Sequence, residues 1–295
     1  MRKKILVTGA NGQVGEELHK LAKSYTSFEF IFATRKRLAL DNPAKIGEYI
    51  YNNKPDYLIN CAAYTAVDKA ESEEELAYTI NAEAPKEMAI ACEANNIQLV
   101  HVSTDYVFDG KGNSPYKEDD ITDPVNLYGD SKLEGEKNIR QHNPSAIIIR
   151  TAWVYSEFGK NFVKTMLRLM AEKDQVNVVS DQRGAPTYAA DLAEAIMNII
   201  SKVEISGHQT PGYGGIYHFS NEGNISWYDF AVAIKELTGS NCIVNPIPTS
   251  QFPTPAKRPF YSVLDKTKIQ NRFGIEIKDW KQSLTICIDR IKQKR

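Results

Sequence analysis

Tyr128 and Lys132 are four positions apart in the segment Tyr-Gly-Asp-Ser-Lys. In a helix, residues at this spacing lie on one face, so the ammonium group sits beside the phenol. A free phenol has a pKa of about 10, and a neighbouring cation favours the phenolate, which brings the pKa closer to the range useful for proton transfer. The pair predicts a proton donor, Tyr128, tuned by Lys132. The alternative is a tyrosine and a lysine on a solvated helix face.

A hydroxyl group is expected at the end of the strand Leu99–Ser103. Ser103 or Thr104 would end that strand at the carboxyl edge of the sheet, where open α/β sheets bind ligands. We assign Thr104 as the hydrogen-bond donor to the reacting oxygen; the alternative is that it only caps a turn. His101 falls inside the same strand, where we expect a core histidine satisfied by its neighbours.

A glycine-rich turn, Thr8-Gly9-Ala10-Asn11-Gly12-Gln13-Val14-Gly15, follows the strand Lys3–Val7 and opens the helix Gln13–Lys23. Gly9 allows a tight turn, Gly12 lets the backbone approach a pyrophosphate, and Gly15 lets the helix pack on the strand. The helix N-terminus adds free N–H groups for phosphate oxygens. The turn therefore predicts a dinucleotide cofactor, held by Gly9, Asn11, Gly12, Gln13, Val14 and Gly15. The alternative is that these glycines only form a tight turn, as they could in any α/β protein.

The strand Phe28–Ala33 ends in Thr34-Arg35-Lys36-Arg37, with no acidic residue before Asp41. A carboxylate at this place would bond the ribose 2′-hydroxyl and select NAD. Arg35 instead offers a planar fork to a 2′-phosphate, and Thr34 adds a hydroxyl. The turn predicts a preference for NADPH over NADH, unless it is only a solvated basic turn.

The first half of the chain alternates apolar strands with helical patterns, which predicts a parallel sheet covered by helices. Further strands are expected at Tyr57–Asn60 and Ala146–Arg150, and further helices at 43–52, 82–94 and 128–140. The fold class is α/β: a doubly wound parallel Rossmann-type sheet with a smaller C-terminal α/β substrate-binding domain.

After Trp153 helical patterns (162–172, 191–202, 227–237 and 284–292) alternate with loop-rich segments at 207–215 and 246–259. The second segment contains five prolines, which favours a rigid loop that runs across the protein surface. The alternative is a loop that closes over a ligand. We expect residues 1–150, with contributions from about 176–204, to form the dinucleotide-binding domain. Residues 151–175 and 205–295 would form the substrate-binding domain.

Composition narrows the function classes. Of 295 residues, 42% are hydrophobic and 25% charged, and 36 Lys and Arg against 37 Asp and Glu give a net charge of −1. Such a chain has no bulk electrostatic reason to bind nucleic acid, and its apolar runs are too short for a membrane span or a signal peptide. Four widely separated cysteines, Cys61, Cys92, Cys242 and Cys287, show no metal-binding spacing, so we expect free thiols, no metal and a cytoplasmic location.

Several longer segments resemble the extended short-chain dehydrogenase/reductase family over nearly the whole chain. They are Gly9–Gly15, Asn60–Glu71, Ser103–Gly110, Tyr128/Lys132, Arg150–Tyr155, Gly184–Thr187 and Arg258-Pro259. Within that family, the resemblance implies NADPH-dependent reduction of the C4 ketone of dTDP-4-dehydro-L-rhamnose to dTDP-L-rhamnose, a step in nucleotide-sugar biosynthesis. The expected partner is this small nucleotide-sugar substrate, and the chain is expected to be a monomer or a homodimer.

The resemblance also implies roles for individual residues. It adds Leu40, Ala62, Ala63, Tyr64 and Thr65 to the cofactor site. For the substrate site it implies Val67, Thr104, Asp105, Tyr128 and Trp153. Related chains often carry an acidic residue where this one has Ala39, which weakens the expected adenine-side contacts. Some relatives are described with magnesium, but no acidic cluster for it is visible here, and we predict no metal.

Two other functions fit the same family. A nucleotide-sugar dehydratase or epimerase would share the fold, but dehydratases that resemble this chain use a Thr-Asp-Glu run, and here Tyr106 follows Thr104-Asp105. A non-catalytic subunit that binds nicotinamide nucleotide is the other alternative. The intact Tyr128, Lys132 and Thr104 set disfavours it, although fold does not fix function.

Overall fold

The computed structural model describes residues 2–206 and 212–294. Strands and helices alternate through its first half, and Pro85 sits in the first turn of α5, where no backbone N–H is needed. The elements are β1 (Lys3–Thr8), α1 (Gln13–Leu21), β2 (Phe28–Ala33), α2 (Ile46–Asn53), β3 (Tyr57–Asn60), α3 (Val67–Ala70), α4 (Glu74–Tyr78), α5 (Ala84–Ala94), β4 (Gln98–Thr104), α6 (Leu127–His142) and β5 (Ile147–Thr151).

The second half has shorter strands between longer helices. Its elements are β6 (Val154–Tyr155), α7 (Phe162–Glu172), β7 (Gln175–Val179), β8 (Arg183–Gly184), β9 (Thr187–Tyr188), α8 (Ala189–Ser206), β10 (Gly215–His218), β11 (Ile225–Ser226), α9 (Trp227–Thr238), β12 (Ile243–Ile247), α10 (Thr267–Phe273) and α11 (Trp280–Gln293). Short 3₁₀ turns occupy 22–24, 43–45, 105–107 and 249–251, and a π-turn at 79–83 precedes α5.

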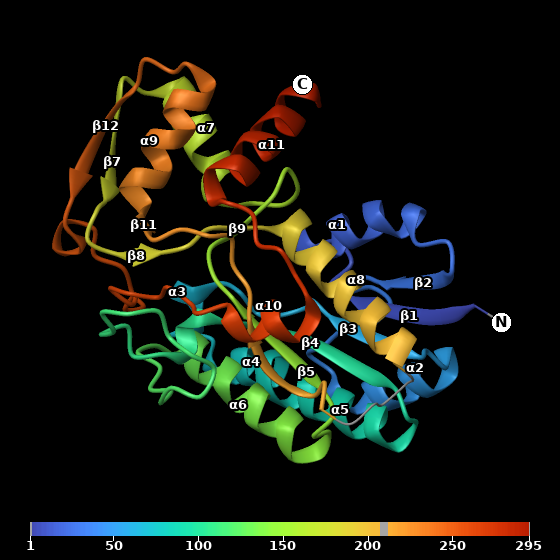
Figure 1. Ribbon diagram of the computed structural model, residues 1–295. Helices are drawn as coiled ribbons and strands as arrows, with labels where there is room; N and C mark the ends of the chain where they lie inside the picture. Colours follow the sequence, from blue (N-terminus) through green and yellow to red (C-terminus); the bar gives the residue numbers. More distant parts are fainter. Residues whose placement is uncertain (1, 207–211, 295) are drawn as a thin grey trace.

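A six-stranded parallel sheet in the order β10-β5-β4-β3-β1-β2 forms the centre of the molecule. The inner strands β1, β3, β4 and β5 are mostly buried on both faces, which is why their apolar residues do not alternate with polar ones, whereas the edge strand β2 is only partly buried. Ile5 and Ile147 pack against α1 and α8 on one face, whereas Leu6 and Ile148 pack against α2, α5 and α6 on the other. Figure 1 shows these two helical layers on either side of the sheet. The predicted doubly wound α/β class is confirmed.

Two strand pairings differ from our expectation. β10 lies in a stretch that we assigned to the second domain, yet it extends the central sheet beside β5. β7, which we counted among the contributions of 176–204 to the first domain, pairs instead with β12, almost 70 residues later in the chain. Helix α8 of that stretch does pack on the sheet. Only tertiary packing decides these pairings, because each short apolar run fits either neighbour.

The β7–β12 pair forms a second cluster with α7, α9 and α11 (Figure 1). Its core is built around Tyr155, Tyr188 and Phe230. Pro246 stands inside β12, where it is tolerated because, among the described strands, β12 pairs with β7 alone. Part of the expected loop at 207–215 lies outside the described residues.

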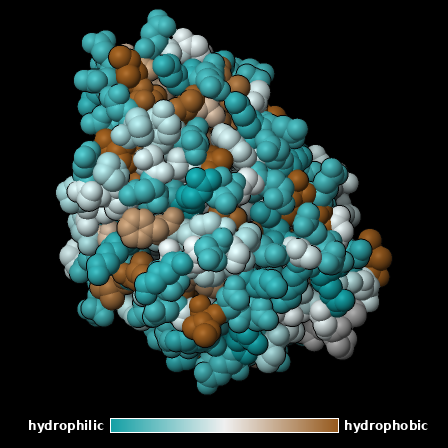
Figure 2. Space-filling view, turned by 60° about the vertical axis from the view of Figure 1, so that its left-hand side comes forward, coloured by the Kyte–Doolittle hydropathy of each residue, from teal (hydrophilic) through white to brown (hydrophobic). Residues whose placement is uncertain are grey.

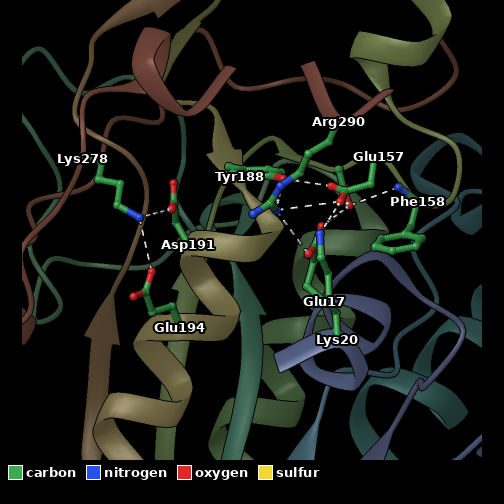
Figure 3. A network of polar contacts seen from close by, with 10 residues as sticks. Glu17, Lys20, Glu157, Phe158, Tyr188, Asp191, Glu194, Lys278 and Arg290 are labelled. Carbon is green, nitrogen blue, oxygen red and sulfur yellow. Dashed lines mark hydrogen bonds and ion pairs between the residues drawn. The ribbon is translucent and has the colours of Figure 1, made fainter. Parts of the chain in front are cut away.

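A polar network connects this cluster to α1 (Figure 3). Arg290 of α11 bonds the Tyr188 hydroxyl at 2.7 Å and lies 3.9 Å from the carboxylate of Glu17. Ser156 donates to Glu17 at 2.7 Å, and Lys20 pairs with Glu157 at 3.1 Å. Both glutamates are almost fully buried.

The surface view in Figure 2 is mostly hydrophilic, with apolar groups scattered rather than gathered in one patch. No helix within the described ranges is both long enough and apolar enough to cross a membrane. All four cysteines are free thiols; Cys92, Cys242 and Cys287 are buried, whereas Cys61 is half-buried.

Candidate active site

One cavity of about 780 Å³ opens at the carboxyl ends of the central strands. The turns after β1, β3, β4 and β5 contribute to its walls. The chain runs from β1 outward to β2 and then returns to β3 on the other side of β1, so the cavity lies at the switch point of the sheet. Open α/β sheets bind their ligands at this place.

The glycine turn forms one end of the cavity. Gly9 has φ +67°, and a Cβ on it would lie 2.7 Å from the backbone nitrogen of Ala62. A Cβ on Gly15 would lie 2.3 Å from the Gly9 carbonyl oxygen, so Gly15 serves close helix packing and does not itself line the cavity. The lining residues of the turn are Gly9, Ala10, Asn11, Gly12, Gln13 and Val14.

Helix α1 begins at this turn without a side-chain cap, because Gly12 is its N-cap residue. The first N–H groups of the helix and its positive dipole end are therefore available to an anion. A dinucleotide fits this cradle: the glycines leave room for phosphate oxygens, and the cavity volume is in the range of cofactor sites.

The turn after β2 forms the adjoining wall with Arg35, Leu38, Leu40 and Asp41. Arg35 is exposed and donates to the Asp41 carboxylate at 2.6 Å. The sequence predicted a basic turn with no acid before Asp41, but the fold brings Asp41 itself to the cavity. Thr34 is absent from the lining; its carbonyl oxygen accepts from Arg37 and Leu38 within the turn.

The segment after β3 contributes Cys61, Ala62, Ala63, Thr65 and Val67 to the lining. Tyr64, also predicted for the cofactor site, does not line the cavity. Its backbone nitrogen bonds Asn81 at 2.9 Å and its hydroxyl donates to Glu73 at 2.6 Å.

Tyr128, Lys132 and Thr104 meet in this cavity. Asn126 caps the N-terminus of α6 by accepting from Gly129 at 2.8 Å, which fixes the helical turn that carries Tyr128. The Tyr128 ring stands edge-on to Tyr106, with centroids 5.6 Å apart. Thr104 is the last residue of β4; its hydroxyl oxygen accepts from the Tyr106 nitrogen at 3.2 Å, and its hydroxyl donates to the Asp105 carboxylate at 3.1 Å. It therefore caps a turn and also lines the same cavity as Tyr128.

Burial dominates the electrostatics of this group. It raises the pKa of Tyr128 to about 12, with a smaller lowering by the Thr104 hydroxyl. The expected lowering of the phenol pKa by Lys132 is not seen: the Lys132 Nζ instead donates to the Val102 carbonyl at 2.8 Å and lies 3.2 Å from the His101 Nε2. Burial also lowers the pKa of Lys132 to about 8, opposed by the charges of Glu136 and Cys61.

Asp105 and Trp153 also line the cavity, and the Val154 carbonyl next to Trp153 accepts from Gln13 of the glycine turn at 3.2 Å. Asp105 is buried, which raises its pKa to about 6. Trp153 has φ +49°, and its ring stacks on Trp227 with centroids 3.6 Å apart. A Cβ on Gly184 would lie 2.7 Å from the Trp153 ring, so a glycine is required there.

Sequence reasoning missed several lining residues. Trp227, Gly159 and Lys160 belong to the second half of the chain and reach the cavity only through the fold. Also missed were Ile80, Val102, Tyr106, Thr151 and Val154. Tyr106 was the one with a signal, since it directly follows Thr104-Asp105.

The proline-rich segment 246–259 is fastened to the first half of the chain. Arg258 forms a two-pronged ion pair with Asp68 of α3, and Asn126 donates to the Lys257 carbonyl at 2.7 Å. Glu71, just after α3, accepts from the Leu127 nitrogen at 3.0 Å, so this helix also contacts the start of α6. The segment contributes no side chain to the cavity lining.

The described residues contain no group of three or more His, Cys, Asp or Glu side chains placed to hold a metal ion.

Comparison with protein families gives a match: the family model described as the RmlD substrate binding domain matches residues 2–293. The chain belongs to this family.

Relatives of this RmlD-family chain carry consistent names. A dTDP-4-dehydrorhamnose reductase of Aggregatibacter actinomycetemcomitans is 44% identical over 287 residues, covering 95% of this chain and 97% of that protein. A crystal structure of a dTDP-4-dehydrorhamnose reductase from Clostridium acetobutylicum superimposes with a TM-score of 0.92 at 42% identity, covering 98% and 99% of the two chains.

A third RmlD-family relative was solved with a cofactor. The dTDP-4-dehydrorhamnose reductase of Bacillus anthracis, in complex with NADP, has a TM-score of 0.90 at 36% identity and covers 98% of this chain and 100% of its own. The glycine cradle described above fits a molecule of that class.

Proposed function

We propose that this chain is an NADPH-dependent reductase that converts the C4 ketone of dTDP-4-dehydro-L-rhamnose into the alcohol of dTDP-L-rhamnose. The observation that carries the proposal is the convergence of Tyr128, Lys132 and Thr104 in the cavity that starts at the glycine turn. The names of the relatives and the NADP complex of one of them support the substrate and the cofactor.

When bound, the reduced nicotinamide supplies the hydride. Tyr128 donates its proton to the ketone oxygen as the alcohol forms, and with a pKa of about 12 it holds that proton throughout the neutral range. Thr104 donates a hydrogen bond to the same oxygen, where negative charge develops. Lys132 orients the nicotinamide ribose and its ammonium form stabilises the phenolate left on Tyr128.

The remaining wall residues divide between the two ligands. The glycine turn (Gly9–Val14), Arg35, Leu40, Ala62, Ala63 and Thr65 would contact the cofactor. Val67, Asp105 and Trp153 would contact the nucleotide sugar. Thr34, Tyr64 and Gly15 support the cofactor site from behind its walls. We also retain the cytoplasm as the compartment, and a monomer or homodimer as the assembly.

An assay that follows NADPH absorbance tests the proposal. With dTDP-4-dehydro-L-rhamnose, NADPH should be consumed in equal amount to the dTDP-L-rhamnose formed. A dehydratase or epimerase would change a nucleotide sugar without net NADPH consumption. A regulatory subunit would bind NADPH and turn nothing over, so either result would overturn the proposal.

A further inference from the structure

A row of buried polar side chains crosses three strands beneath the active site. Thr8, Asn60 and His101 are register neighbours on β1, β3 and β4. Each is at most 1% exposed. Lys132 reaches the end of this row from α6, with its Nζ 3.2 Å from the His101 Nε2 and donating to the Val102 carbonyl at 2.8 Å.

Asn60 has only one possible orientation. Its Oδ1 accepts from the Ala62 backbone nitrogen at 3.1 Å and from the Thr8 hydroxyl at 2.6 Å. A backbone N–H can only donate, so the amide oxygen must face it. The Asn60 Nδ2 is then left to donate to the His101 Nδ1, 2.9 Å away.

This orientation of the Asn60 amide fixes the tautomer of the His101 ring. A neutral imidazole that accepts at Nδ1 carries its proton on Nε2, which is the nitrogen that faces Lys132. An ammonium group has only hydrogens to offer, whereas a neutral amine accepts the Nε2–H. The ammonium form of Lys132 therefore meets a donor at His101, or forces the ring to change tautomer and lose its bond from Asn60.

We propose that His101 is a positioning residue: held by Asn60 as the Nε2–H tautomer, it sets the protonation state of Lys132. Its role lies in the reduction proposed above and rests on that function for its kinetic effect. The row of hydrogen bonds makes the lysine ammonium less stable than burial alone would. Lys132 then changes from donor to acceptor at a lower pH than a free lysine side chain does.

The titratable groups near Lys132 have pKa values well away from that of Lys132, so the loss of the Lys132 proton can be told apart from their titration. Glu136 of α6 and Cys61, just after β3, act on the charge of Lys132, and Tyr128 and Asp105 line the same cavity. Burial raises the pKa of Tyr128 and of Cys61 to about 12, and that of Asp105 to about 6. Glu136 is locked in a buried ion pair with Arg150 at 2.7 Å. Burial and the charge of Lys132 lower the pKa of His101 well below its usual value, so the ring stays neutral.

A direct test measures the tautomer in the unmodified protein. In ¹⁵N-histidine-labelled protein, the NMR shifts of the His101 ring, assigned by its absence from His101→Phe, should show the proton on Nε2. A proton on Nδ1 would overturn the proposal. This readout needs no turnover, so it stands even if the assay finds no reduction of the nucleotide sugar.

Asn60→Asp supplies the variant test. A carboxylate there accepts from the Nδ1–H, which turns Nε2 into an acceptor for the Lys132 ammonium. The tautomer should switch, and the pH at which kcat/KM falls on the alkaline side should rise by about one unit or more. The added negative charge also raises this pH, so the control is Asn60→Asp in the His101→Phe background, where only the charge effect remains. An equal shift in both backgrounds would overturn the proposal; if Asn60→Asp does not fold, the tautomer measurement decides it alone.

Discussion

Tyr128 reaches the cavity from the first turn of α6, and its ring is held against Tyr106. Tyr128→Phe keeps this packing and removes only the proton. We expect kcat to fall by about two to four orders of magnitude with NADPH affinity retained, because the ketone oxygen loses its acid. Stopped-flow turnover and NADPH fluorescence titration measure the two effects. Near-normal turnover would remove Tyr128 from the mechanism.

Arg35 and Asp41 face the same end of the cavity as an exposed ion pair. A 2′-phosphate must compete with Asp41 for the guanidinium, whereas NADH does not. Arg35→Ala should therefore abolish most of a roughly ten- to hundredfold preference for NADPH in kcat/KM, since a charge-assisted bond is worth about 1.5–3 kcal/mol. Asp41→Asn should increase NADPH efficiency by a few-fold, in line with the modest worth of exposed pairs.

Kinetics with NADPH and NADH measure both cofactor variants. Lys36→Ala, an equal change in charge on the neighbouring exposed residue, is the control and should leave the preference in place. If Arg35→Ala changes the preference no more than Lys36→Ala does, Arg35 has no part in the choice of cofactor.

At the scale of elements, the position of α6 depends on a close contact between the backbone at Gly135 and the backbone at Asn81. A Cβ added to Gly135 would lie 2.0 Å from the Asn81 carbonyl oxygen. Gly135→Ala should displace α6, together with Tyr128 and Lys132, and cost about 1–3 kcal/mol of unfolding free energy. Urea unfolding and kcat should both show the loss. Gly47→Ala in α2, where nothing lies within 4 Å, should be neutral or stabilising.

The sequence predicted elements well where local signals and burial agree. The ends of β2, β3 and α7 match the expected residues, because apolar runs or the Asn161 cap define them. Helix α8 starts at Ala189 rather than Asp191, and runs to Ser206. Tyr128, Lys132 and the glycine turn were predictable because their spacing is local. Trp227 was not, since its position beside Trp153 depends on how the second half folds back.

At the scale of the whole molecule, the free energy of unfolding should depend on pH through the polar network that joins α1 to α11. Burial and the neighbouring Glu157 raise the pKa of Glu17 to about 7. The folded protein therefore holds a proton there that the unfolded chain releases near pH 4.5, so this group costs stability as pH rises from about 4.5 to 7. Glu157 has the opposite effect on stability: burial raises its pKa, but hydrogen bonds, among them those from Tyr188 and Lys20, outweigh burial and lower the pKa below its ordinary value.

Glu17→Gln imitates the protonated form permanently. Relative to the unmodified chain, we expect it to gain about 1–3 kcal/mol of unfolding free energy at pH 8 and little at pH 5. Urea unfolding at the two pH values measures this. Glu16→Gln, on the same turn of α1, is the control. A gain that is equal at both pH values would show that Glu17 is ionised in the folded protein throughout.

The stacked pair of Trp153 and Trp227 also gives the molecule an optical property. Both indoles line the cavity, and they are two of the three tryptophans in the chain. Two stacked rings with centroids 3.6 Å apart couple their electronic transitions, and a skew between the two transition moments gives a paired positive and negative band in circular dichroism. A reduced nicotinamide held nearby absorbs where indole emits, so excitation of tryptophan should reappear as cofactor fluorescence. Occupancy of the cavity can thus be followed by light, without a label and before any turnover.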